Sequence, residues 1–209
     1  MLWYDLFANG YDLSLEHLYR SYRAQSVAAL RLEPGMRVLV PACGTGQDLD
    51  GLVEAVGPEG RVVGVDYSAG MLKRAQKRID KAGWQNVTLL ERDILALTDA
   101  DLTEAGVPEV DRLLFSLALS VLPDWEAMFE RAFERLTPGG RFAIFDVHAY
   151  RRVPQSWCVE WMANADLSRE VWRPAQELGE GVEVQKLEGS PHIHGGTPML
   201  IHGRRKRNA

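Results

Sequence analysis

The sequence is poor in cysteine and has no long apolar run. Cys43 and Cys158 are the two cysteines among its 209 residues, and they do not form the disulfide framework that is typical of small secreted domains. No apolar stretch approaches the roughly 18 residues that a membrane span needs. The N-terminal segment does not have the basic region and apolar core of a signal peptide. We therefore expect a cytoplasmic protein.

An excess of positive charge is also missing. The formal net charge is -5 at pH 7, and such a chain has no general affinity for the phosphates of nucleic acid. One basic cluster, Arg204-Arg205-Lys206-Arg207, lies near the C-terminus. Its two interpretations are a solvated tail and a peripheral contact with an anionic membrane surface. The charge balance therefore predicts a partner other than nucleic acid.

The chain has short β-branched runs that alternate with helical patterns, at a length that suits one domain. Strands are expected at 36–42, 61–66, 86–93, 110–119 and 141–148. The segments between them are expected to be helical at 47–56, 69–82 and 124–136, with a short helix or loop at 97–108. Because strands joined by helical crossovers form parallel sheets covered on both faces, this pattern predicts a doubly wound α/β fold with a mostly parallel, Rossmann-like sheet.

The two ends of the domain differ from its core. Residues 11–32 have the apolar pattern of an amphipathic helix, and 151–180 are expected to be helical in part. An added C-terminal strand pair is expected at 181–189 and 198–205, around the loop 190–197. We divide the single domain 1–209 into an N-terminal helical lid (1–33), a cofactor-binding core (34–148) and a C-terminal helix with the last strands (149–209).

The stretch VLVPACGTGQD joins the first strand to a helix through two glycines. Gly44 and Gly46 let the backbone approach a ligand without a Cβ in the way, and the start of the helix favours negative charge. Asp66 ends the second strand, about 20 residues further along, where an acid can accept hydrogen bonds from both hydroxyls of a ribose. The loop and Asp66 together predict an adenosine-containing cofactor.

Two features disfavour a nucleotide-dependent dehydrogenase. A dinucleotide fingerprint has a glycine three residues after Gly46, where this chain has Leu49. The Tyr-x-x-x-Lys pair of short-chain dehydrogenases is absent as well. A mononucleoside cofactor without a pyrophosphate fits the loop better.

The core resembles the class I S-adenosylmethionine-dependent methyltransferases over residues 34–148. The segments that carry this resemblance are VLVPACGTG, VVGVDYSAGML, LLERDIL, DRLLFSLALSVLPDW and LTPGGRFAIFDVH. YDLFANGYD and SLALSVLPDW are also similar to segments of quinone-biosynthesis and phosphatidylethanolamine N-methyltransferases. The resemblance implies a methyltransferase that uses S-adenosylmethionine as its cofactor.

The resemblance also implies which residues contact the cofactor. The glycine loop, with Ala42, Cys43, Gly44 and Gly46, would line the methionine part, and Asp66 would hold the ribose. The remaining contacts would be Tyr67 and Met71 beside the adenine, Asp93 and the Ile94 N–H at the adenine edge, and Ser116 and Leu117 beneath the sulfonium. The aromatic residues of the N-terminal segment, with Tyr11 and Tyr22 as further cofactor contacts, would close a lid or, alternatively, cover the sheet.

The glycine loop departs from the family pattern at two positions. Val40 stands where the family often has an acid that helps to hold the cofactor's amino group, and Ala42 replaces a frequent glycine. Ala42 has little energetic effect unless its φ is positive. Asp48 either compensates for the missing acid or is an exposed partner of the helix dipole. We expect the loop still to bind, with a non-catalytic S-adenosylmethionine-binding protein as the alternative.

The acceptor is predicted to be a small molecule or a lipid head group. The fourth strand ends in FSLAL and not in the Asn/Asp-Pro-Pro-aromatic motif that the family uses on amino groups of nucleobases or glutamine. His148, at the end of the fifth strand, is either a base or substrate contact in catalysis or a polar residue at a strand end. His192 and His194 have no carboxylate or cysteine at ligand spacing, so no metal site is predicted.

Overall fold

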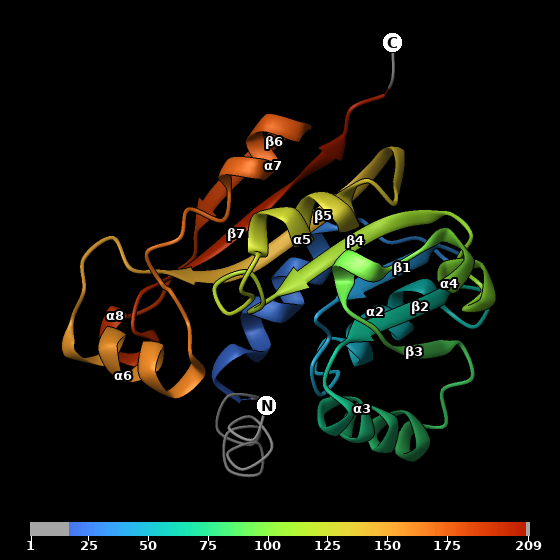
Figure 1. Cartoon of the computed structure of the whole chain (residues 1–209), viewed down its shortest axis with the longest axis horizontal. Coiled ribbons are helices and arrows are strands. Elements are labelled where there is room, and N and C mark those ends of the chain that lie inside the picture. Colours follow the sequence, from blue (N-terminus) through green and yellow to red (C-terminus); the bar gives the residue numbers. More distant parts are fainter. Residues whose placement is uncertain (1–16, 208–209) are drawn as a thin grey trace.

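A computed structural model describes residues 17–207, and within them seven strands form one sheet in the order β3-β2-β1-β4-β5-β7-β6 (Figure 1). The strands are β1 (Arg37–Pro41), β2 (Arg61–Asp66), β3 (Val87–Glu91), β4 (Val110–Ser116), β5 (Leu136–His148), β6 (Gly179–Lys186) and β7 (Thr197–Arg205). β1 to β5 run parallel, whereas β7 is antiparallel to β5 and β6. The predicted mostly parallel sheet with an added C-terminal strand pair is confirmed.

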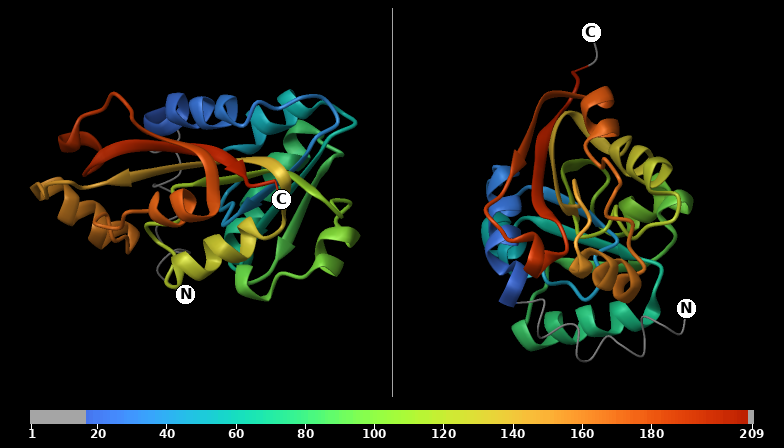
Figure 2. Two further views of the ribbon diagram at one scale, coloured as in Figure 1. Left: turned by 90° about the horizontal axis from the view of Figure 1, so that it is seen from above. Right: turned by 90° about the vertical axis from the view of Figure 1, so that its left-hand side faces the viewer.

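Helices cover both faces of this sheet (Figure 2). They are the N-terminal helix, described over residues 17–29, then α2 (Leu49–Val56), α3 (Ala69–Ala82), η1 (Ile94–Ala96), α4 (Asp99–Glu104), α5 (Trp125–Phe133), α6 (Pro154–Ala163), α7 (Arg173–Leu178) and α8 (Pro191–His194). The apolar side chains of α2 and α3 form one core with one face of the strands, and those of α4, α5 and α7 form a second core with the other face. The fold is therefore doubly wound. Across the described residues, the structure contains no helix with the length and apolar character of a bilayer span.

The signals at the ends of α3 explain why its boundaries were predictable. The Ser68 hydroxyl accepts a hydrogen bond from the Met71 N–H at 3.3 Å, which satisfies one free donor of the first turn. Gly83 ends the helix with φ +73, a left-handed conformation that glycine adopts without a Cβ clash. The predicted helix at 69–82 matches α3 (Figure 1).

Among the parallel strands, β4 and β5 depart furthest from their predicted bounds. β5 begins at Leu136 and not at 141, because Leu136 pairs with Val110 across an irregularity in the β4–β5 ladder. Gly139, at φ +81, adopts a backbone conformation that a bulged strand accommodates. β4 ends at Ser116 and not at 119, because Leu117 turns the chain at φ +52. The loop expected at 190–197 contains the short helix α8.

The described part of the N-terminal helix is packed firmly against the C-terminal part of the chain. Tyr22 stacks on Phe145 of β5, and its hydroxyl donates to the Glu188 carbonyl oxygen at 2.6 Å. Because that hydroxyl has one proton, the contact of 3.2 Å to His194 Nε2 requires the histidine to donate. Tyr19 is buried in the same cluster. Residues 1–16, which include Tyr11 and about half of the expected lid (1–33), lie outside the described residues.

Candidate functional site

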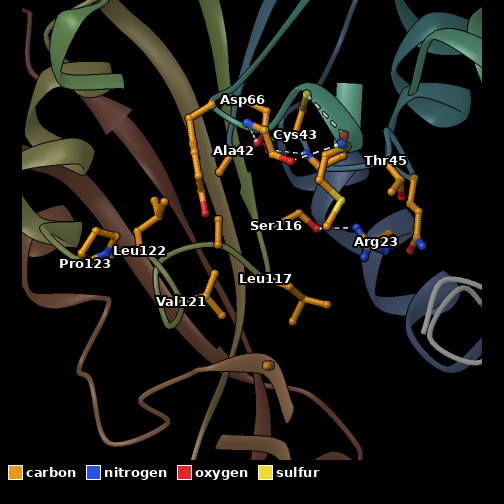
Figure 3. Close-up of a pocket in the computed structure, with 17 residues that line it drawn as sticks. Arg23, Ala42, Cys43, Thr45, Asp66, Ser116, Leu117, Val121, Leu122 and Pro123 are labelled. Carbon is orange, nitrogen blue, oxygen red and sulfur yellow. Dashed lines mark hydrogen bonds between the residues drawn. The ribbon is translucent and has the colours of Figure 1, made fainter. Parts of the chain in front are cut away.

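A pocket opens at the carboxyl ends of β1, β2 and β4 (Figure 3). Its lining comes from the glycine loop (42–47), the start of α3 (66–71) and the loop after β4 (116–123). Arg23 of the N-terminal helix and Ala163 of α6 complete it. Parallel sheets present ligands at this edge, so the pocket is where the sequence predicts the cofactor.

The structure brings together most of the predicted site residues. The residues that line the pocket are Ala42, Cys43, Gly44, Asp66, Tyr67, Met71, Ser116 and Leu117. Asp93 and Ile94 line a second pocket. It shares with the first pocket Ala42, Asp66, Tyr67, Leu122 and Pro123. Gly46, Tyr22 and His148 do not line either pocket. The predicted residues therefore form two adjoining hollows on either side of Asp66.

The two glycines of the loop have different structural requirements. A Cβ on Gly44 would meet no atom within 4 Å, so this backbone is open to a ligand. A Cβ on Gly46 would lie 2.6 Å from Leu49 Cδ1 and 3.2 Å from the Cβ of Ala75. Gly46 therefore allows the loop to pack closely against α2 and α3, which the sequence-based interpretation as a ligand contact did not anticipate.

Ala42 adopts a left-handed conformation with φ +50. This is the condition under which replacing the family's glycine has an energetic cost, because an L residue in this region is strained by about 1–2 kcal/mol. We expect Ala42→Gly to relieve this strain. Since glycine also gains about 0.4–1 kcal/mol of freedom in the unfolded chain, the net gain in the free energy of unfolding lies between zero and about 1.6 kcal/mol.

A melting experiment on the cofactor-free protein checks this expectation, since 1 kcal/mol shifts the midpoint by about 2–4 °C for a chain of this size. Gly44→Ala is the matched control, because Gly44 has φ +55 and room for a Cβ. Gly44→Ala should lower the melting temperature, whereas Ala42→Gly should raise it. A lower melting temperature for Ala42→Gly would contradict the strain at this position.

Asp66, at the end of β2, joins the glycine loop to the start of α3. Its Oδ2 accepts from the Gly44 N–H and its Oδ1 from the Ser68 N–H, both at 2.9 Å. Burial raises the pKa of this carboxyl group, while backbone donors at Ser68, Gly44 and Tyr67 oppose the shift. A carboxylate has about four acceptor positions, so beside these three backbone donors at least one position remains for a further donor such as a ribose hydroxyl.

Arg23 is the site residue that sequence reasoning missed. Its Nη1 donates to Asp48 Oδ2 at 2.6 Å and to the Ser116 hydroxyl at 2.9 Å. The Asp48 side chain is 4% exposed, so the interpretation of Asp48 as an exposed dipole partner is wrong. The available signal was spacing, because Arg23 follows the buried Tyr19 by one helical turn and so falls on the apolar stripe. The pocket therefore contains a cation beside the glycine loop.

Cys43 is buried, and its side chain packs against β2. A Cβ on Gly64 of β2 would lie 2.8 Å from Cys43 Sγ, so the thiol occupies the space that this glycine leaves. Burial raises the pKa of the Cys43 thiol, with the Asp66 charge adding to the shift. The thiol is therefore protonated at neutral pH and is not a nucleophile.

His148 is buried behind the loop after β4, among aromatic side chains. Its Nδ1 lies 3.1 Å from the Arg169 carbonyl oxygen, and its ring meets Tyr150 and Trp172 edge-on. It does not line the pocket. In the part of the chain that the structure describes, no group of three or more His, Cys, Asp and Glu side chains is placed to hold a metal ion.

The basic cluster near the C-terminus supports two helix ends. Arg205 Nη1 donates to the Glu134 carbonyl oxygen at 2.6 Å, just after α5, and Lys206 Nζ donates to the Glu177 carbonyl oxygen of α7 at 3.0 Å. Cations are favourable at the carboxyl ends of helices. These contacts give two of the four basic residues a structural role.

Comparisons with known proteins agree with this geometry. A family model described as a methyltransferase domain matches residues 32–191. A demethylmenaquinone methyltransferase of Listeria welshimeri is 29% identical over 129 residues, which are 62% of this chain and 52% of the relative. The chain thus spans about half the length of the curated relatives that it matches.

Solved structures of methyltransferases share the fold. One is the methyltransferase named in a complex with the Haloferax volcanii Trm112 methyltransferase activator, with a TM-score of 0.74, 19% identity and 98% of both chains covered. Another is an S-adenosylmethionine-dependent O-methyltransferase of Thermotoga maritima, with a TM-score of 0.63 and 21% identity, covering 90% of this chain and 66% of that one. At these identities the likeness concerns the fold alone.

Proposed function

Since the chain belongs to the class I S-adenosylmethionine-dependent methyltransferases, we propose that it transfers a methyl group to a small-molecule acceptor with an apolar body. One observation carries this proposal. The open backbone at Gly44, the carboxylate of Asp66 and the guanidinium of Arg23 meet in a single pocket, whose side along the loop after β4 is apolar. Such a pocket suits a zwitterionic nucleoside on one side and an apolar molecule on the other.

The adenosine end of the cofactor fits the two adjoining hollows. Asp66 would accept hydrogen bonds from the ribose hydroxyls, and Tyr67 and Met71 would pack against the adenine. Asp93 and the Ile94 N–H, in the second hollow, would form hydrogen bonds with the edge of the adenine. When bound, S-adenosylmethionine supplies an electrophilic methyl group on its sulfonium. The protein's contribution is to orient the acceptor toward that methyl group and to exclude water.

The methionine end would be held by Arg23 and not by an acid on β1. Val40, at the position of that acid, is 2% exposed and belongs to the apolar core. Arg23 lies beside Ser116 and the glycine loop (Figure 3), where its guanidinium would pair with the cofactor's carboxylate. Arginine is suited to this role because its planar fork of donors matches a carboxylate.

The acceptor would lie against the loop after β4. Leu117, Ala118, Val121, Leu122 and Pro123 give this side of the pocket an apolar surface. The demethylmenaquinone methyltransferases to which the chain is similar support an acceptor of this kind. A charged lipid head group is the alternative acceptor, and the apolar wall offers it few hydrogen-bond partners. The acceptor screen distinguishes the two.

Calorimetry and an acceptor screen test the proposal. The protein should bind S-adenosylmethionine and S-adenosylhomocysteine but not NADH, and should release S-adenosylhomocysteine with demethylmenaquinone or another small apolar acceptor. Release with phosphoethanolamine alone would favour a lipid head group. Binding of NADH alone would overturn the proposal, and cofactor binding without release across the panel would favour the non-catalytic alternative.

Arg23 is tested in the same calorimetry. A hydrogen bond to a charged group contributes about 1.5–3 kcal/mol, so Arg23→Met should weaken S-adenosylhomocysteine binding about tenfold or more. The double variant Arg23→Met/Asp48→Asn should weaken binding to a similar extent as Arg23→Met, and it does not leave the buried Asp48 carboxylate without its partner. Arg20→Met, which removes an exposed arginine of the same helix, is the matched control and should bind as the parent does. Parent-like binding by the double variant would exclude Arg23 from the site.

A further inference from the structure

The loop after β4, residues 117–123, supplies most of the apolar wall of the pocket. Leu117 begins it in a left-handed conformation at φ +52, which L residues other than Asn and Asp rarely adopt. The Leu117 N–H donates to the Phe145 carbonyl oxygen of β5 at 2.7 Å. A strained backbone conformation, such as that of Leu117, persists only where surrounding contacts hold it. The contacts that hold this loop come from outside the glycine loop.

Asp146 of β5 holds the middle of this loop. It is 1% exposed. Its Oδ2 accepts from the Ser120 N–H at 3.0 Å, and its Oδ1 accepts from the Ser120 hydroxyl at 2.7 Å. The Val147 N–H is a further donor to Oδ1, at 2.8 Å. A buried carboxylate is unfavourable unless hydrogen bonds satisfy it, and two of these donors belong to the loop.

Arg169, between α6 and α7, holds the carbonyl groups of the same loop. Its Nη1 donates to the Leu119 oxygen at 2.8 Å and to the Leu122 oxygen at 2.5 Å. The Asp166 N–H donates to the Ser120 oxygen at 2.8 Å. Three carbonyl groups of the loop thus accept hydrogen bonds from residues 166–169. The main chain of Arg169 is itself supported, since its oxygen lies 3.1 Å from His148 Nδ1.

We propose that Asp146 and Arg169 are positioning residues that fix the loop 117–123 as the wall against which the acceptor is placed. This inference rests on the proposed function. Most of the proposed cofactor contacts lie on the glycine loop, the end of β2 and the start of α3. The loop 117–123 is fixed by β5 and the segment 166–169, and it reaches the cofactor side through Leu117, Leu122 and Pro123. Loss of either positioning residue should therefore weaken acceptor binding more than cofactor binding. His148 contributes through Arg169 and not by touching the reacting atoms.

Arg169→Met is the test, and Arg173→Met is its matched control. Arg173 is an arginine of α7 with a 68% exposed side chain that pairs with Glu170. In Arg169→Met, amide hydrogen exchange over residues 117–122 should quicken at least about tenfold, the change that a lost hydrogen bond to a charged group produces. The Kd for S-adenosylhomocysteine should rise by a smaller factor than the KM for the acceptor, because most of the proposed cofactor contacts lie outside the loop. Arg173→Met should change neither quantity.

Kinetics with demethylmenaquinone add a readout that a purely structural role would not move. The KM for the acceptor should rise by a larger factor than the KM for S-adenosylmethionine, and Arg169→Lys should restore part of the loss. If Arg169→Met does not fold, Asp146→Asn serves the same measurements. Unchanged exchange at 117–122, or a loss of cofactor affinity parallel to a loss of stability, overturns the inference. If the parent turns over no acceptor, the proposed function fails, while the exchange and calorimetry still decide how the loop is held.

Discussion

Asp66→Ala is expected to lower the affinity for S-adenosylhomocysteine at least about tenfold. The substitution removes two proposed hydrogen bonds from ribose hydroxyls to a carboxylate, worth about 1.5–3 kcal/mol each before water compensates, and 1.4 kcal/mol corresponds to tenfold in Kd. It also releases the Gly44 and Ser68 N–H groups, which Asp66 holds at 2.9 Å. The loss should therefore exceed that of the ribose contacts alone.

Titration calorimetry measures this loss, with two companion variants. Asp66→Asn keeps one acceptor oxygen and should fall between the parent and Asp66→Ala. Asp93→Ala should have the smaller effect, because it removes only a contact at the adenine edge. Parent-like binding by Asp66→Ala would show that the ribose is held elsewhere.

Val40→Asp is expected to destabilise the protein without tightening cofactor binding. The substitution restores the acid that related glycine loops often have, but Val40 is 2% exposed and packs in the core between β1 and the helices α2 and α3. A charge buried without a partner lowers stability by about 3–5 kcal/mol. The free energy of unfolding should fall by about this amount. Burial should also raise the pKa of the new carboxyl group.

Denaturant unfolding and calorimetry on the same samples decide this. Val40→Thr keeps the shape of the side chain and adds a neutral hydroxyl, so it should lose less stability than Val40→Asp. A large gain in affinity with unchanged stability in Val40→Asp would show that the loop is ready to accept an acid at this position.

Local chemistry made much of the fold predictable. Ser68 caps the start of α3 and Gly83 ends it, and both residues act on the backbone within one helical turn. The bounds of this helix could therefore be predicted. The spacing from the glycine loop to Asp66 could be interpreted because it spans one β-α-β unit. Most of the predicted pocket residues lie on the strand ends that this unit fixes.

Features that depend on distant partners could not be predicted in this way. Arg23 reaches Ser116 across the carboxyl edge of the sheet, a contact that no local pattern encodes. The early start of β5 depends on the pairing of Leu136 with Val110. His148 stood at a suitable strand end, but its surroundings come from Arg169 and Trp172, which belong to the C-terminal part.

The docking of Tyr22 implies an order of events during synthesis on the ribosome. Its hydroxyl meets Glu188 and His194, which follow it by 166 and 172 positions. Contacts of such sequence separation form late, because closing a long loop is entropically unfavourable. The N-terminal helix leaves the ribosome before α8 has been made, so the contacts of Tyr22 with Glu188 and His194 are expected to form late in folding. A nascent chain that stops before α8 should therefore hold the helix that carries Arg23 less securely than the full chain does.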